Sequence, residues 1–166
     1  MVLGLSLPAL TLVHVIISLI AIVAGLVVMF GLLGSKPMPG LTAIFLLFTI
    51  LTSATGFLFP FKELLPSHII GIISLVLLAI ACIALYGMKL KGAWRPIYIV
   101  TAMISLYFNV FVLVIQSFLK VPALHAIAPS VPPSGPVFGA VQGIVLVFFA
   151  VVIIGIWRRF KPIAFA

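Results

Sequence analysis

Three histidines are the side chains of this sequence best suited to binding a metal or a redox group. His14 falls inside a long apolar run, where an ionisable residue is unfavourable and is therefore a functional candidate. Its neutral imidazole could coordinate haem iron, zinc or copper. The structural alternative is a hydrogen bond across helices to Asn109 or Gln142. The sequence leaves both interpretations of His14 open.

His68 stands at the start of another apolar run, directly after Pro66 and Ser67. Proline and serine are typical of a helix N-terminus, so His68 is expected at a membrane surface. Gly71, one turn later, would let a flat group approach the helix. We therefore treat His14 and His68 as candidate metal ligands, with a solvated His68 as the alternative.

Glu63 is the one acidic residue of the chain, and it follows Lys62 directly. One interpretation is a gate or ligand role together with His68 and His125. The other is a surface ion pair with Lys62, which contributes about 0–1 kcal/mol. The sequence is compatible with either role for Glu63.

His125 belongs to the longest connection between apolar runs, which reads LKVPALHAIAPSVPPSGP. The prolines of this connection predict a stiff, partly extended lid. Long connections within a compact protein are often functional. His125 is therefore a further candidate for the site.

The amides and hydroxyls form stripes along the apolar runs. Thr101, Ser105, Asn109 and Gln116 recur at helical spacing and share one face. Such stripes should face protein, because lipid offers no hydrogen-bond partner. Counted from the ends of the runs, the histidines and amides lie at mid-membrane or further out. We therefore expect a polar pocket that opens outward, with these ligand-binding candidates: His14, Thr52, Glu63, His68, Asn109, Gln116, His125 and Gln142.

Several kinds of chemistry are excluded by missing residue types. The chain has no aspartate, no glycine-rich phosphate loop and no zinc-protease or serine-hydrolase motif. Paired-carboxylate hydrolysis and ion pumping on membrane carboxylates are therefore not expected. A single cysteine, Cys82, excludes an internal disulfide and a cysteine-based metal cluster.

The elements that must position these residues are read from hydropathy. Hydrophobic residues make up 66% of the chain, charged residues 6%, and the mean hydropathy is +1.55. These values predict a membrane protein rather than a soluble domain. Runs this long and uniform predict helices rather than barrel strands. We expect an all-α bundle of five transmembrane helices, forming one domain over residues 1–166, with spans near 8–33, 41–59, 67–88, 96–118 and 137–157.

The basic residues orient these spans. Lys36, Lys89, Lys91, Arg95, Arg158, Arg159 and Lys161 fall on one side of the expected membrane, and Lys62 and Lys120 on the other. The positive-inside rule then predicts an outer N-terminus and a cytoplasmic C-terminus. The net charge of +8 is explained by contact with the lipid bilayer, and no pattern typical of nucleic-acid binding is present.

Three segments carry a resemblance to known sequences: TSATGFLFPF, LPSHIIGIISL and FNVFVLVIQSFLKVPALHAIAP. They resemble those of small polytopic bacterial inner-membrane proteins of unassigned function. The resemblance covers most of the chain from His14 onward. It implies a multi-pass protein of the bacterial inner (cytoplasmic) membrane and implies no activity.

The expected function is binding of a redox or lipophilic ligand in the outward pocket, such as haem b, a quinone or a metal ion. One alternative is a transporter or channel for a small solute. Another is a structural subunit of a larger membrane complex, whose small-residue faces dock a membrane-protein partner or a second copy. The sequence does not decide whether the protein is an enzyme.

Overall fold

The computed structural model describes residues 3–60 and 66–160, and over this range the chain is helical without a β-strand. Its elements are α1 (Leu7–Leu33), α2 (Pro39–Gly56), α3 (Pro66–Cys82), the π-helical turn η1 (Ile83–Gly87), α4 (Trp94–Lys120), α5 (Pro122–Ile127) and α6 (Pro136–Arg159). Five helices are long and apolar enough to cross a membrane: Leu7–Leu33, Pro39–Gly56, Ser67–Gly87, Trp94–Lys120 and Pro136–Arg159. They indicate a multi-pass membrane protein, and they agree with the expected spans to within a few residues.

Local sequence explains where the helices begin. The side chain of Ser6 caps α1 by accepting a hydrogen bond from the Ala9 amide at 3.3 Å. Proline occupies the first turn of α1, α2, α5 and α6. Its fixed φ suits this position, and the amide hydrogen it lacks would have had no partner within the helix. The prolines that flank the apolar runs therefore mark the helix starts.

The connection that carries His125 differs from the extended lid expected from its prolines. Its first part folds into the short helix α5, and the segment 128–135 that follows is irregular. Pro122 provides a favourable first helical residue, and the alanines and leucine that follow are good helix formers. The prolines at 129, 132 and 133 come only after this turn, so they end the helix rather than prevent it.

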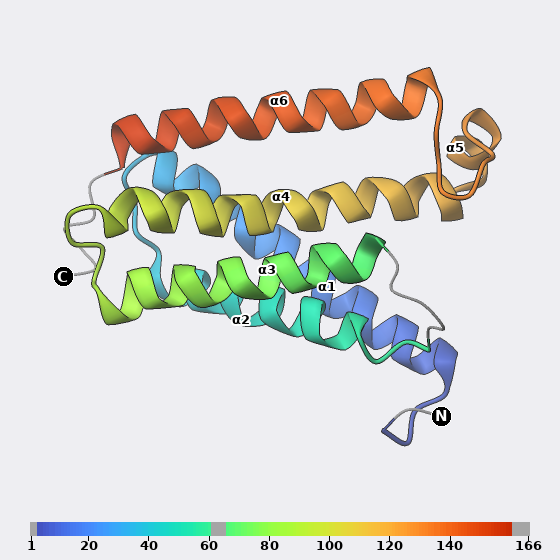
Figure 1. The fold of residues 1–166 in the computed structure, drawn as a ribbon, viewed down its shortest axis with the longest axis horizontal. Helices are drawn as coiled ribbons and strands as arrows, with labels where there is room; N and C mark the ends of the chain where they lie inside the picture. The colour runs from blue at the N-terminus through green and yellow to red at the C-terminus, as the bar shows by residue number, and fades with distance from the viewer. Residues whose placement is uncertain (1–2, 61–65, 161–166) are drawn as a thin grey trace.

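The helices run alongside one another, with the connections gathered at two ends (Figure 1). We call one end the basic end, because it carries Lys36, Lys89, Lys91, Arg95, Arg158 and Arg159. The other is the histidine end, where α1 begins, where α3 begins with His68 in its first turn, and where α5 carries His125. Helix α4 is central and packs against all the other helices, whereas α1 packs mainly on α2 and α6 mainly on α4.

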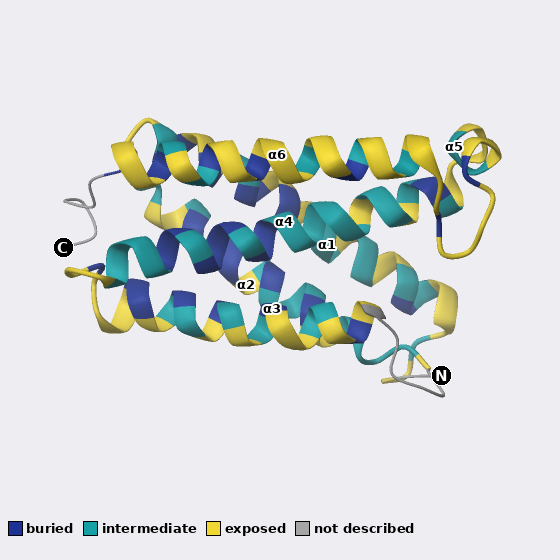
Figure 2. Cartoon of the chain, turned by 45° about the horizontal axis from the view of Figure 1, so that its top comes forward, coloured by how far each residue is buried: buried dark blue, intermediate teal, exposed yellow. Residues whose placement is uncertain are grey.

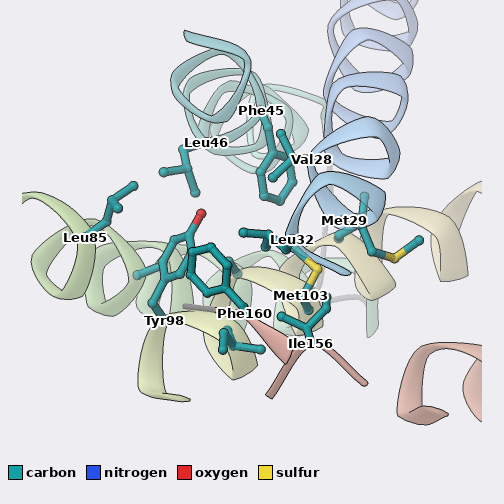
Figure 3. Close-up of a cluster of buried hydrophobic side chains, with 14 of the residues drawn as sticks. Val28, Met29, Leu32, Phe45, Leu46, Leu85, Tyr98, Met103, Ile156 and Phe160 are labelled. Carbon is teal, nitrogen blue, oxygen red and sulfur yellow. The ribbon is translucent and has the colours of Figure 1, made fainter. Parts of the chain in front are cut away.

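The hydrophobic core occupies the half of the bundle nearest the basic end. Figure 3 shows Phe45 and Leu46 of α2 facing Tyr98 of α4 and Leu32 of α1. The buried residues of this cluster lie in the helix halves nearest the basic end, apart from Leu90 and Phe160, which lie just outside helices at that end. Buried hydroxyls occur in both halves, with Thr42, Thr101 and Ser105 toward the basic end and Thr49 and Ser53 toward the histidine end. The buried histidine and amide, His68 and Gln142, lie in the histidine half, so the large hydrophobic cluster and these stronger polar groups occupy different ends of the molecule.

Hydrogen bonds to α6 hold the basic end together. The Arg95 guanidinium of α4 donates to the carbonyl oxygens of Trp157 at 3.0 Å and Phe160 at 2.9 Å. The Ser35 hydroxyl, just after α1, donates to the carbonyl oxygen of Arg159. These carbonyls end a helix and have no partner within it. The last turn of α6 is thus capped from two other parts of the chain.

The outer surface of the bundle is apolar along the helices. In Figure 2 most of α6 is exposed, and large side chains such as Ile144 and Val151 are 70% and 63% exposed. A soluble monomer rarely exposes so continuous an apolar surface. A lipid bilayer would cover this surface without a cost in free energy, because lipid tails are as apolar as these side chains.

Candidate ligand site

His14 lies two turns into α1 and is held by the last turn of α2. Its Nδ1 atom is 2.7 Å from the Thr55 hydroxyl oxygen. The edge of the imidazole also meets the Phe59 ring, with centroids 5.3 Å apart and the planes at 79°. The ring is half-buried and fixed from two directions.

The Thr55 hydroxyl determines which imidazole nitrogen carries the proton. This hydroxyl lies 2.7 Å from the carbonyl oxygen of Leu51, to which it donates, as threonine does within helices. A hydroxyl has one proton, so Thr55 must accept its second hydrogen bond from Nδ1–H of His14. In the neutral imidazole the lone pair then resides on Nε2. No hydrogen bond to Nε2 comes from residues 3–60 or 66–160, so this nitrogen can accept one from a ligand or bind a metal centre.

The partner of His14 was not among the residues expected from the sequence. Asn109 and Gln142 were the expected partners, and Thr52 was the site candidate on α2. Thr52 only donates to the carbonyl oxygen of its own helix at Phe48, at 2.7 Å. The sequence signal that could have identified Thr55 is its position along the helix. Because α1 and α2 are joined by a short connection and run antiparallel, the start of α1 lies level with the end of α2.

His68 is buried on the other side of the same α2 terminus. Its ring lies against Phe57, with centroids 5.6 Å apart. A Cβ atom at Gly71 would lie 3.1 Å from the Phe57 ring. The flat group that approaches Gly71 is therefore a side chain of the protein itself. His14 and His68 flank the segment Thr55–Phe59 from α1 and α3 respectively.

The amide candidates pair with other partners. The Asn109 side chain of α4 donates to the Thr49 hydroxyl of α2 at 3.4 Å, which is a long hydrogen bond. The Gln142 side chain of α6 donates to the carbonyl oxygen of Phe111 at 3.1 Å. Its own carbonyl oxygen, Oε1, is buried and has no partner in the described part of the chain. The structure thus places His14, Asn109 and Gln142 at three different helix interfaces.

Two further candidates, Gln116 and His125, lie toward the histidine end. Gln116 is exposed on α4. His125 is half-buried, and its Nδ1 atom lies 3.3 Å from the carbonyl oxygen of Phe118. Glu63 and Lys62 lie outside the described residues. Three or more histidine, cysteine or acidic side chains do not gather into a metal site anywhere in segments 3–60 and 66–160.

Two open grooves lie on the surface of α1, and neither is lined by His14. One has a volume of about 500 Å³ at the histidine end and is lined by Leu7, Pro8, Thr11, Leu12 and Val15. The other has a volume of about 390 Å³ and lies between α1 and α2, nearer the basic end. The His14 site is therefore a single fixed imidazole between helices, and the apolar groove at Leu7–Val15 lies on a neighbouring face of the same turns of α1.

Comparison with protein-family models, curated proteins and solved structures found no match to this chain. The resemblance to small bacterial inner-membrane proteins stays a prediction, and the five apolar helices are the part of it that the fold shows.

Proposed function

We propose that this protein is a multi-pass membrane protein that binds a lipophilic, hydroxyl-bearing redox ligand of the quinol class through Nε2 of His14. The observation that carries the proposal is the hydrogen bond between His14 and Thr55, which leaves Nε2 as an acceptor at a fixed position. A quinol hydroxyl needs one such acceptor. The neighbouring groove at Leu7–Val15 offers the apolar surface that the rest of such a ligand requires.

Haem b is the second ligand that a single imidazole could serve, as an axial ligand to iron. An isolated metal ion fits less well, because a structural zinc site takes four ligands and a catalytic one three. The described histidines and cysteine do not form such a set. With His14 as the one ligand-binding histidine, His68 supports the end of α2 through its contact with Phe57.

Binding of decylubiquinol to purified protein in lipid nanodiscs tests the proposal. His14→Ala should abolish saturable binding, because the acceptor nitrogen is removed. His125→Ala is the matched control, since it removes a half-buried imidazole from α5 and should leave binding unchanged. A reduced-minus-oxidised absorption spectrum of protein from haem-supplied cells tests whether the ligand is haem b instead of a quinol. Equal quinol binding by the wild type and His14→Ala would refute the proposal.

We propose further that the protein belongs to the bacterial inner membrane, with the basic end in the cytoplasm. The support is the distribution of charge: among described basic residues, Lys120 alone lies at the histidine end. Fusions to the C-terminus test this orientation. A green fluorescent protein should fluoresce there and an alkaline phosphatase should be inactive, whereas the reverse pattern would contradict it.

A further inference from the structure

The groove between α1 and α2 is apolar along its whole length. Its walls are large aliphatic side chains from the second half of α1 and the first two turns of α2: Leu19, Ile20, Val23, Ala24, Val27, Leu41 and Ile44. Its volume is about 390 Å³, and it is open along its length to the surrounding membrane region. The groove is therefore a shallow apolar surface on which part of a hydrocarbon chain can lie.

The groove ends near the connection that carries Lys36. It reaches Leu41, in the first turn of α2, and the connection just before that turn carries the exposed residue Lys36. The Lys36 amide donates to the carbonyl oxygen of Gly31 at 2.7 Å. Ser35, its neighbour, is bonded to the end of α6. Ser35 and Lys36 are thus hydrogen-bonded to the ends of α6 and α1 respectively.

The positive charge at the basic end is not balanced by acidic side chains in the described part of the chain. Lys36 is accompanied by Lys89, Lys91, Arg158 and Arg159, all of them exposed. Residues 3–60 and 66–160 contain no acidic side chain that could neutralise them. An anion from another molecule, such as a lipid headgroup, would complement this charge.

We propose that the α1–α2 groove and Lys36 bind an anionic phospholipid, with its phosphate at Lys36 and an acyl chain in the groove. Juxtamembrane basic residues attract anionic lipid headgroups in this way. A second helix is a poorer occupant, because helix association in membranes relies on small residues and polar contacts. The groove offers neither, since Ala24 is its one small residue and is buried. The lipid site does not depend on the ligand proposed for His14.

Native mass spectrometry of the protein released from mixed vesicles tests this site. The vesicles contain equal amounts of dioleoylphosphatidylglycerol and dioleoylphosphatidylcholine, which share their acyl chains and differ in headgroup charge. The wild type should retain phosphatidylglycerol preferentially. Lys36→Gln should reduce that retention about fivefold, with phosphatidylcholine unchanged. Lys120→Gln, which removes a lysine at the histidine end, should have no effect.

A second variant tests the groove itself. Val23→Trp fills the groove from a position that is 61% exposed, so the fold should tolerate it. It should reduce retention of phosphatidylglycerol while leaving Lys36 in place. Equal retention by the wild type and Lys36→Gln would overturn the proposal. A dimer that disappears with Val23→Trp would also overturn it, because the groove would then belong to a second copy.

Discussion

Nδ1 of His14 and the hydroxyl oxygen of Thr55 lie 2.7 Å apart and join α1 to the last turn of α2. This relationship decides the chemistry of the imidazole, because the proton on Nδ1 leaves Nε2 as the acceptor. It also makes Thr55 a positioning residue that sequence spacing alone did not identify.

Thr55→Val should weaken quinol binding without removing it. Valine keeps the shape of threonine but accepts no hydrogen bond, so the imidazole loses its fixed tautomer and orientation. One neutral hydrogen bond contributes about 0.5–1.5 kcal/mol, which corresponds to a loss of affinity of about two- to thirteenfold. Thr55→Ser should retain wild-type affinity. Titration of both variants, together with the ¹⁵N shifts of His14, checks this, and an unchanged Thr55→Val would refute it.

Gly25 is expected to be intolerant of any side chain. A Cβ atom there would lie 2.6 Å from Cδ1 of Leu106 and 2.8 Å from the ring of Phe45. Both neighbours are buried in the core, so Gly25→Ala should lower the free energy of unfolding by about 1–3 kcal/mol. Gly139→Ala is the matched control, since its Cβ would meet nothing within 4 Å. Unfolding in mixed micelles should separate the two variants, and equal midpoints would contradict the packing.

Arg95→Ala should loosen the end of α6. Two carbonyl oxygens, those of Trp157 and Phe160, would lose a charged donor. Hydrogen bonds to charged groups contribute about 1.5–3 kcal/mol each, and the partial exposure of Arg95 places the expected loss toward the lower value. Amide exchange in the last turn of α6 should accelerate. Arg158→Ala removes an exposed arginine nearby and should leave the exchange unchanged; equal acceleration in both would contradict the cap.

Stability should depend on the basic half of the bundle more than on the histidine half. Phe45→Ala opens a cavity in the core and should lower the free energy of unfolding by about 3 kcal/mol. Gln142→Leu removes one hydrogen bond but also a buried oxygen without a partner, so its effect should stay within about 0.6 kcal/mol. Unfolding titrations of both variants check this contrast, and a larger loss for Gln142→Leu would reverse it.

The sequence was sufficient to predict the five long helices. An apolar run that crosses a membrane must satisfy its backbone hydrogen bonds within the run, and an α-helix does this. Prolines such as Pro8, Pro39 and Pro136 marked the starts, because proline suits the first turn. The gathering of the histidines and of Gln116 and Gln142 toward one end of the helices was also visible in the sequence.

Only the tertiary structure decided which polar groups meet. Helical periodicity gives the face on which Asn109 lies, but it does not give the neighbour that covers this face. The packing of α2 between α1, α3 and α4 directs Thr55 to His14 and Thr49 to Asn109. The same packing fills the space at Gly71 with Phe57 and leaves Gln116 exposed. These outcomes depend on helix positions in three dimensions, because a contact between helices is fixed by their relative rotation and depth, which no single helix encodes.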